Sequence, residues 1–186
     1  MRSRKFTQPK KPKEHFLVLC EGKTEETYVN LLRQYFHLPI TIKIIVTGNS
    51  ITARLLNQYI NEMNLQKGDT CRIFLIYDGD IPCIIDNIEK LDGQSIITTP
   101  CIELWFALHH TDHKKTLQTA HATKLLNTTH QAWKKYTKGH LSIEQKKLLI
   151  DNMKIACERS KKLPARLNPS SDFHLFIEDL EKVKNR

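Results

Sequence analysis

The sequence predicts an α/β fold, with a parallel sheet flanked by helices and a helical C-terminal half. Short apolar runs alternate with segments of helical periodicity between residues 15 and 110. This alternation is typical of a parallel sheet that is covered on both faces. Few strand patterns occur after residue 110. We therefore expect a flexible basic arm at residues 1–14, an α/β core at residues 15–110 and a helical extension packed on the core at residues 111–186.

Four strands are predicted in the core, each short and either continuously apolar or rich in β-branched residues. They lie at residues 15–20, 41–46, 72–77 and 95–98. The first and the third end abruptly in acidic residues next to a glycine. Continuous apolar runs of this length are typical of strands buried on both faces of a sheet.

Helices are predicted between the strands and throughout the C-terminal half. The first runs from Thr24 to Phe36, and the others lie at about residues 51–64, 83–91, 101–110, 116–126, 142–162 and 173–183. Thr24, with Thr27 or the neighbouring acids, closes the first turn of the first helix, and Ser50 caps the second. Pro100 is expected at the first position of the fourth, where its missing N–H costs nothing. Residues 168–172 form a break before the last helix.

The composition indicates a soluble, cytoplasmic, globular protein. Of the 186 residues, 40% are apolar and 26% are charged, which suits one domain with a hydrophobic core. No apolar run approaches the roughly 18 residues that a membrane span needs, so we expect no membrane partner. The basic N-terminus lacks the apolar segment of a secretory signal.

The five cysteines are expected to be reduced and mostly buried. Their number is odd, no Cys-x-x-Cys pair occurs, and they do not cluster, which argues against a structural zinc site. They are Cys20, Cys71, Cys83, Cys101 and Cys157.

The charge distribution favours a polyanionic partner. The formal net charge is +9, and residues 2–13 carry six Lys or Arg and no acid. A second basic segment at residues 134–147 includes Lys134, Lys135 and Lys138. Segregated positive charge of this kind is typical of proteins that bind nucleic acid, with simple solubility as the alternative.

Acidic residues follow the first and third predicted strands directly. Glu21 follows the first strand, and Asp78 and Asp80 follow the third. In an open α/β sheet, ligands bind beyond the carboxyl ends of the strands. Because parallel neighbours end at the same edge, we expect all three carboxylates to lie there together.

This set of acids suits Mg²⁺, with Mn²⁺ as an alternative. Mg²⁺ prefers octahedral oxygen ligands and keeps several waters, so two or three carboxylates and phosphate oxygens suffice. Asp78 and Asp80 would point to opposite faces of an extended chain, and a turn at Gly79 redirects them toward one cation. Glu21 is then a third ligand or a general acid/base. Spacing alone favours the alternative interpretation, in which the acids are ordinary turn and cap residues.

Residues just after Glu21 have two interpretations as well. Glu25 and Glu26 lie about one helical turn further on, within reach of a second metal. Gly22 permits close approach of the backbone to a phosphate. Lys23 either contacts that phosphate or is solvated, and the P-loop pattern is absent.

Four blocks of the sequence resemble the RloB-like family, whose relatives include the AbiL-type abortive-infection partner protein. The first block matches the family's hydrophobic strand, which is followed by E-G-x-T-E and a tyrosine. The other three match its D-x-D block, its N-P-C-F-E-x-W-x-x-x-H block and its terminal N-P-[ST] segment. The blocks are Phe16–Tyr28, Phe74–Asp80, Thr98–His109 and Asn168–Leu180. Tyr136-Thr137-Lys138 resembles a Y-x-K element of the same family. Thr99 replaces a usual asparagine, and Ile81 replaces a frequent acid, which suggests fewer metal ligands after the D-x-D block.

The resemblance implies a Toprim, Rossmann-like fold similar to that of OLD nucleases, topoisomerases and DnaG-type primases. In that fold, the glutamate after the first strand and the D-x-D block bind Mg²⁺, which assigns these roles to Glu21, Asp78 and Asp80. The resemblance also implies a prokaryotic anti-phage setting, often beside an AAA/ABC-type ATPase.

Three further residues become catalytic candidates through the resemblance. Glu103 and His109 lie six positions apart on one predicted helix, so they share a face only loosely. His109 is a general base or a phosphate contact, and the alternative for both residues is packing or hydrogen bonding. Lys138 either meets a phosphate as a point charge or is solvated. Trp105 is expected in the core.

These observations leave several functions open. The first is Mg²⁺-dependent hydrolysis of phosphodiester bonds in DNA or RNA during abortive infection, with Lys23, Lys134, Lys135 and Lys138 supplying phosphate contacts. The second is a non-catalytic regulatory partner of an ATPase that binds metal or nucleic acid. The third is nucleotidyl transfer, as in primases. The sequence leaves homo-oligomerisation open.

Overall fold

The computed structural model describes residues 12–186 and has the predicted α/β architecture. Its sheet has the strand order β2-β1-β3-β4-β5. The strands are β1 (Glu14–Cys20), β2 (Thr41–Val46), β3 (Thr70–Asp78), β4 (Gln94–Thr99) and β5 (Ser170–Ser171). The first four are parallel, as predicted, and β5 pairs antiparallel with β4.

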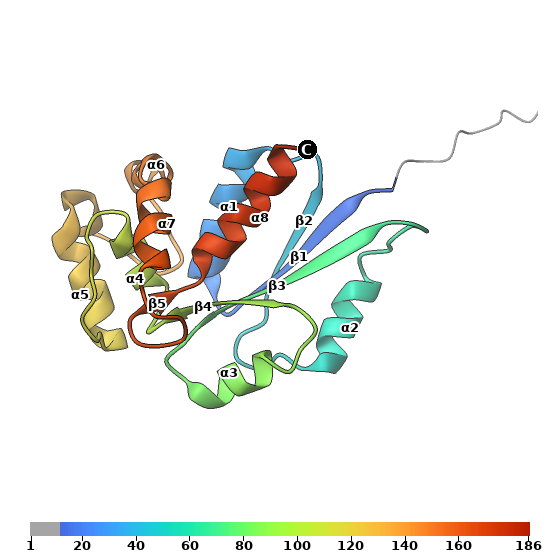
Figure 1. Ribbon diagram of the computed structural model, residues 1–186, viewed down its shortest axis with the longest axis horizontal. Helices are drawn as coiled ribbons and strands as arrows, with labels where there is room; N and C mark the ends of the chain where they lie inside the picture. The colour runs from blue at the N-terminus through green and yellow to red at the C-terminus, as the bar shows by residue number, and fades with distance from the viewer. Residues whose placement is uncertain (1–11) are drawn as a thin grey trace, which may run out of the picture.

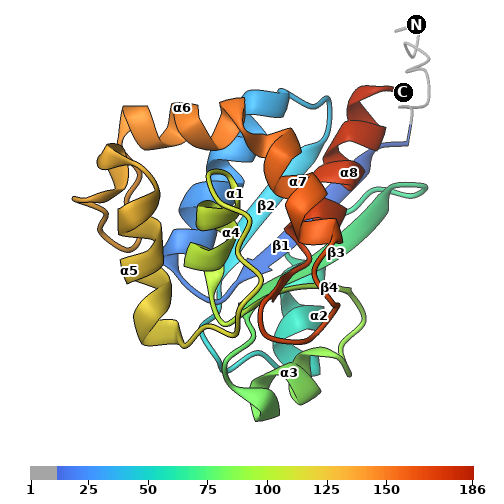
Figure 2. The same cartoon turned by 60° about the vertical axis from the view of Figure 1, so that its left-hand side comes forward.

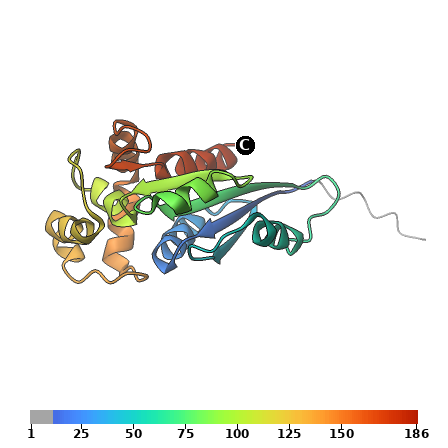
Figure 3. The ribbon, with the colours of Figure 1, turned by 90° about the horizontal axis from the view of Figure 1, so that it is seen from below.

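Helices cover both faces of the sheet. They are α1 (Lys23–Phe36), α2 (Ala53–Asn61), α3 (Pro82–Ile88), α4 (Ile102–Leu108), α5 (Thr119–Thr129), α6 (Ile143–Asp151), α7 (Met153–Lys161) and α8 (Phe173–Lys184), with a 3₁₀ turn η1 at Gln131–Trp133. Helices α1 and α8 lie on one face, and α2 and α3 lie on the other (Figures 1 and 3).

The strand β1 shows why the apolar runs are continuous. Its side chains alternate between the two faces, and both faces are buried. Phe16 and Val18 enter the core beneath α1 and α8, whereas Leu17 and Leu19 enter the core above α2 and α3. Each of these four side chains has no exposed surface.

Helices α4, α5, α6 and α7 lie beyond the carboxyl ends of the strands, whereas α8 covers a face of the sheet. Helix α4 lies between α5 and α7 (Figure 2), and all its residues are buried, including Trp105. Among residues 12–186, none of the helices has the length and apolar character needed to cross a membrane. The position of α4 brings its first residues to the edge where the predicted acids are found.

Several local predictions are wrong. Pro100 is not the first residue of a helix, because a cis Thr99–Pro100 peptide precedes α4, which begins at Ile102. Thr52, not Ser50, caps α2 by accepting a hydrogen bond from the backbone N–H of Leu55. The helix predicted at 142–162 is two helices, α6 and α7, separated by Asn152.

Two other boundaries also move. The break predicted at residues 168–172 contains β5, which is held at the sheet by the Thr98–Ser171 pair. Most of the predicted basic arm lies outside the described residues. Its last part is ordered, because Lys13 donates a backbone hydrogen bond to Asp69 at 2.8 Å and Glu14 begins β1. All five cysteines are free thiols, of which only Cys83 is exposed.

Candidate active site

The ends of β1 and β3 place two of the predicted acids side by side. Glu21 follows β1, and its Oε2 atom accepts a hydrogen bond from the backbone N–H of Asp78 at 2.9 Å. Asp78 ends β3, and its Oδ1 atom accepts a hydrogen bond from the backbone N–H of Ile102 at 2.9 Å. The strand order therefore joins Glu21, Asp78 and the start of α4.

Two buried acids on α1 and α4 adjoin this pair. Glu25 accepts a hydrogen bond from the backbone N–H of Gly22 at 2.9 Å. Glu103 is 0% exposed, and its Oε1 atom accepts a hydrogen bond from the Tyr136 hydroxyl at 2.9 Å. Its Oε2 atom is buried and has no hydrogen-bond partner within residues 12–186. An unpaired buried carboxylate oxygen is costly unless a proton or a cation meets it.

Burial and mutual repulsion raise the pKa values of the site carboxyls. Burial, followed by the charges of Glu25, Glu21 and Glu103, raises the pKa of Asp78 to about 9. Burial, with the charges of Glu21 and Glu103, raises the pKa of Glu25 to about 7. Burial also raises the pKa of Glu21, although the hydrogen bond from Asp78 and the charge of Lys138 oppose it. A cluster of this kind stabilises bound protons or a bound cation.

Lys138 brings positive charge to the cluster. Its Nζ atom lies 3.6 Å from Oε1 of Glu103, and 62% of its side chain is exposed. Burial alone lowers the pKa of Lys138, but the nearby carboxylates, above all Glu103, outweigh it and raise the pKa above its usual value. Because the stem is flexible and largely exposed, the ammonium group can also reach a ligand beside the carboxylates.

The segment that carries Lys138 is fastened to α1. The backbone N–H of Gly139 donates to Oγ1 of Thr24 at 2.9 Å, and Oγ1 of Thr27 donates to the carbonyl of Gly139 at 2.9 Å. Gly139 has a φ of +78°, and a Cβ atom there would lie 3.0 Å from the Lys23 side chain. Glycine suits both conditions. These contacts fix one wall of the site.

The carboxylates and this wall enclose a pocket of about 390 Å³. A pocket of this size holds a small ligand or part of a larger one. Its lining residues are Glu21, Gly22, Lys23, Thr24, Glu25, Asp78, Ile102, Lys138, Gly139 and His140.

Asp80, by contrast, does not line the pocket. It is exposed, and its Oδ2 atom accepts a hydrogen bond from Oγ1 of Thr119, the first residue of α5, at 2.9 Å. Gly79 is needed for close packing as well as for the bend after β3. A Cβ atom on Gly79 would lie 2.0 Å from Oγ1 of Thr99 in β4. The structure thus separates the two aspartates of the D-x-D block.

His109 is not brought to the carboxylates either. It lies at the far end of α4, where its Nδ1–H donates to the carbonyl of Trp105 at 2.9 Å and its ring contacts that indole. Burial lowers the pKa of His109 to about 3. The imidazole is therefore neutral and serves in packing, which is the alternative that the sequence left open.

The lysines predicted to contact nucleic acid occupy different positions. Lys23 lines the pocket, is 70% exposed and pairs with Glu26 at 2.5 Å. Lys134 and Lys135 follow η1 and are exposed, but they do not line the pocket. They share a short segment with Lys138, so the basic surface and the pocket are adjacent along the chain.

The site carboxylates fit a divalent cation in their chemistry but not in their present orientation. Within residues 12–186, no three Asp, Glu, His or Cys side chains are arranged as a ready-made metal site. Glu21, Glu25 and Asp78 each turn one oxygen to a backbone N–H instead. Their chemistry nevertheless fits Mg²⁺, because carboxylate oxygens are its preferred protein ligands and Glu103 keeps a buried oxygen without a partner. Metal binding therefore requires modest reorientation of these side chains.

Sequence reasoning missed the residues that support the site. Tyr136 was singled out only as part of a matching element, yet it hydrogen bonds Glu103. Thr24 and Thr27 were expected to close a helix turn, yet they fasten Gly139. The Y-x-K element could have pointed to Tyr136, because a buried tyrosine hydroxyl usually needs a polar partner.

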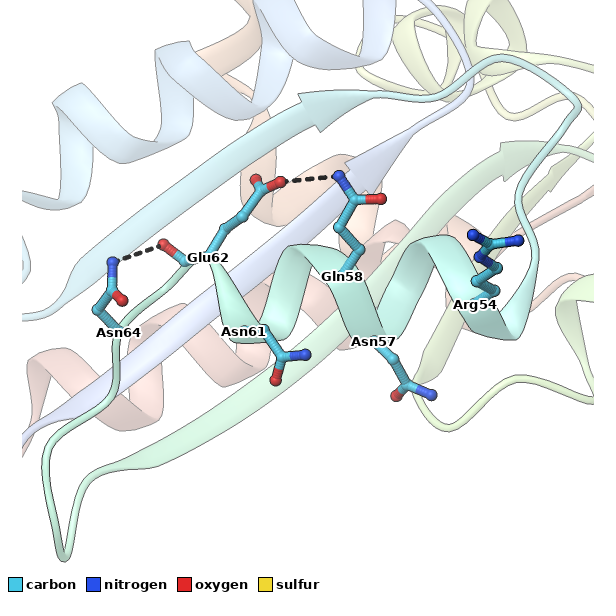
Figure 4. A pocket seen from close by; sticks show the side chains of 6 residues that line it. All are labelled: Arg54, Asn57, Gln58, Asn61, Glu62 and Asn64. Atoms are coloured by element: carbon cyan, nitrogen blue, oxygen red, sulfur yellow. Dashed lines mark hydrogen bonds between the residues drawn. The ribbon is translucent and has the colours of Figure 1, made fainter.

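A hollow of about 810 Å³ on the outer surface of α2 has a different character (Figure 4). It is lined by Arg54, Asn57, Gln58, Asn61, Glu62 and Asn64. Several of these groups satisfy one another, as in the Gln58–Glu62 hydrogen bond at 3.0 Å. None of them belongs to the carboxylate cluster, and we assign no chemistry to this surface.

Comparison with known protein families gives one match that spans most of the chain. A family model described as RloB-like protein matches residues 16–180. The match includes β1 to β5 apart from the first residues of β1, together with Glu21, Asp78, Glu103 and Lys138. The chain therefore belongs to the RloB-like family. Comparisons with curated proteins and with solved structures found no match.

Proposed function

We propose that this RloB-like protein is a Mg²⁺-dependent, Toprim-type nuclease that hydrolyses phosphodiester bonds of DNA or RNA in prokaryotic anti-phage defence. The single observation that carries the proposal is the partly buried carboxylate cluster at the carboxyl edge of the sheet. Glu21, Glu25 and Asp78 repel one another in a pocket that also presents Lys138, and the charge of the fully buried Glu103 adds to this repulsion. Such a site gains stability from a divalent cation and a phosphate together.

The ligand roles divide between the pocket and its rim. Glu21, Asp78 and Glu25 would hold the cation, and Glu103 offers its unpartnered Oε2 atom from the side. Asp80 would join them only after leaving Thr119. When bound, Mg²⁺ supplies Lewis-acid stabilisation of negative charge on the scissile phosphate.

The chain's own residues would position the substrate. Lys138 can exchange its contact with Glu103 for a phosphate oxygen, because its ammonium group is largely exposed. Lys23, whose side chain lies beside Gly139, also lines the pocket. Lys134 and Lys135 add sequence-independent affinity beyond the pocket through phosphate contacts. Glu21, which accepts a hydrogen bond from the backbone N–H of Asp78, is the candidate for a general acid or base.

A regulatory function is the second candidate. In that case, the chain binds metal or nucleic acid without cleaving it and controls an AAA/ABC-type ATPase in the cytoplasm. The hydrogen bonds that turn the carboxylates toward backbone N–H groups favour this alternative, because no ready-made metal site exists within residues 12–186.

The test is cleavage of plasmid, single-stranded DNA and total tRNA with Mg²⁺ or Mn²⁺. Wild type is run beside Asp78→Asn, which keeps the shape and the hydrogen bond to Ile102 but removes the charge. Cleavage that needs metal and disappears in the variant supports the nuclease and names its substrate. Binding without cleavage by either protein, with or without the ATPase, rejects it and leaves the regulatory function.

A further inference from the structure

The strand β2 forms an open edge of the sheet. It is last in the strand order and pairs only with β1 among residues 12–186. It contains no proline and no bulge that would prevent further pairing. Its one lysine, Lys43, forms an ion pair with Glu62 (Nζ to Oε2, 3.2 Å), so its charge does not prevent pairing with another strand. Open apolar edge strands are templates for pairing with another strand.

The register of β1 and β2 shows which backbone groups are free. Cys20 is opposite Val46, and the backbone N–H of Thr47 donates to the carbonyl of Cys20 at 2.9 Å. In a parallel pair, alternate residues of a strand bond to the same neighbour. The odd-numbered residues of β2 therefore face β1. Ile42, Ile44 and Val46 direct their N–H and C=O groups outward.

The side chains of these outward residues are apolar and share one face. Ile42 and Ile44 enter the core beneath α1, and Val46 follows them in the alternation of the strand. Val46 is nevertheless 43% exposed. The edge thus offers the outward backbone groups of three residues, although the Ile42 carbonyl also accepts a hydrogen bond from Arg33 at 3.4 Å. The apolar stripe lies at the same three residues.

We propose that two copies of this chain associate through their β2 strands, in an antiparallel pair whose two-fold axis passes beside Ile44. In this register Ile44 meets Ile44 of the second copy, and Ile42 meets its Val46. All three outward residues then exchange backbone hydrogen bonds, and no other two-fold register pairs all three. The apolar stripe also becomes continuous, which covers Val46.

Charges on α1 fit the same two-fold axis. Arg33 donates to the carbonyl of Ile42 at 3.4 Å, so it lies level with the start of β2. Glu26 lies seven residues earlier, about 10 Å along the helix, and the span from Ile42 to Val46 is about 13 Å. Because α1 runs antiparallel to β2, Glu26 lies near the level of Val46. The axis that exchanges Ile42 with Val46 therefore brings Arg33 of one copy toward Glu26 of the other, where it would join the existing Lys23–Glu26 ion pair.

Asn30 lies between Arg33 and Glu26 and would be near the axis. All three line a groove of about 640 Å³ that also includes Ile42 and Ile44. The groove is thus self-complementary in charge and in backbone register, which favours a second copy over an unrelated peptide. The two carboxylate pockets would lie at opposite ends of one sheet that runs through both copies.

Sedimentation analysis of the full chain over a wide concentration range tests this dimer, together with residue-resolved amide exchange. We expect a reversible dimer in which the N–H groups of Ile44 and Val46 exchange more slowly as the concentration rises. Arg33→Glu should weaken association at least about tenfold, because the substitution acts twice in a symmetric pair. The double variant Glu26→Arg/Arg33→Glu should restore it.

Lys90→Glu serves as a control, because it makes the same charge change on an exposed residue just after α3. It should leave the association unchanged. Val46→Lys gives a second test that does not depend on charge pairing, since it places a cation in the apolar stripe. A monomer at all concentrations overturns the proposal. A dimer whose β2 amides exchange freely, or that Arg33→Glu leaves intact, overturns it equally.

Discussion

Two buried regions of this molecule hold ionisable groups in their neutral form, and they differ in what surrounds those groups. In the carboxylate pocket, burial is the main cause that raises the pKa of Asp78 to about 9. In the helical half, burial is the main cause that lowers the pKa of His109 to about 3. His110, nearby, also has a lowered pKa, and its Nε2 atom accepts a hydrogen bond from Trp133 at 3.0 Å.

The difference teaches that burial alone does not mark a functional site. His109 contacts Trp105 and is enclosed, so its neutral form is a matter of packing. Asp78 shares an open pocket with Glu21 and Glu25, whose charges add to the effect of burial. Like charges beside an opening favour the binding of a cation. The Nε2 atom of His109 also lacks a hydrogen-bond partner within residues 12–186, but this residue is 2% exposed and lines no such opening.

The largest effect on stability and activity should come from adding Mg²⁺ to the carboxylate pocket. Saturating Mg²⁺ should raise the free energy of unfolding of wild type by about 3 kcal/mol at a hundredfold excess over Kd. Asp78→Asn should lose most of this stabilisation and should lower nuclease activity at least about a hundredfold. The unliganded variant should be more stable than wild type, because a repelled buried carboxyl group is gone. Urea unfolding of wild type and Asp78→Asn, each with and without Mg²⁺, measures these differences in stability.

The pH dependence sharpens the same test. Mg²⁺ must displace protons from Asp78 and Glu25, whose pKa values are about 9 and about 7. Its stabilising effect should therefore increase from pH 6 to pH 9. A raised concentration of NaCl controls for general ionic effects. Equal stabilisation of wild type and Asp78→Asn by Mg²⁺ would show that the carboxylate pocket, like the region around His109, does not bind a cation through its buried ionisable group.

The fold was largely predictable because its signals are local. The apolar runs at residues 15–20 and 72–77 identify strands that are buried on both faces, and the structure extends each by only a few residues. Boundaries set by a single hydrogen bond were less predictable. Thr52 caps α2 although Ser50 was equally suitable by type, and the cis peptide before Pro100 has no local signature.

The site was predictable only where strand ends fix the position of a residue. Glu21 and Asp78 follow neighbouring strands, so the sheet brings them together. Asp80 is two residues beyond the strand end, where the contact with Thr119 determines its direction. The contact between Glu103 and Tyr136 joins residues far apart in the chain, and no periodicity could have indicated it.

The histidine region should respond to acid. The pKa of His109 is about 3 in the folded state, against about 6.5 in the unfolded chain. Its neutral form therefore contributes stability above pH 6.5 that is lost as the pH falls toward 3. Between pH 7 and pH 5 the loss is about 2 kcal/mol.

His109→Asn removes the titrating group but keeps a donor for the carbonyl of Trp105. The difference in unfolding free energy between wild type and this variant should therefore shrink by that amount from pH 7 to pH 5, as measured by urea denaturation. The carboxyls of the pocket titrate in both proteins, so their contribution cancels. A difference that does not change with pH would show that His109 is not held neutral by burial.

Removing the tyrosine hydroxyl should have a smaller effect on stability. Tyr136→Phe leaves both oxygens of Glu103 without a neutral donor, with only Lys138 at 3.6 Å. We expect a loss of about 1.5 kcal/mol, as for a hydrogen bond to a charged group. In a Glu103→Gln background, the same substitution should cost clearly less. Equal costs in both backgrounds would show that the hydroxyl stabilises its surroundings independently of Glu103.

The smallest effect should come from Lys138, which tests whether the pocket faces phosphate as well as metal. Lys138→Met removes one charge that is 62% exposed, so the fold should change little. If the ammonium group contacts a phosphate, affinity for nucleic acid should fall by less than about tenfold, and the slope of log K against log salt should become shallower by about 1. Lys90→Met, on an exposed residue away from the pocket, should leave the slope unchanged. Fluorescence anisotropy at several salt concentrations distinguishes the two variants. Identical slopes for both variants would mean that Lys138 contacts Glu103 and no phosphate. Lys138 would then have only a structural role, as His109 does.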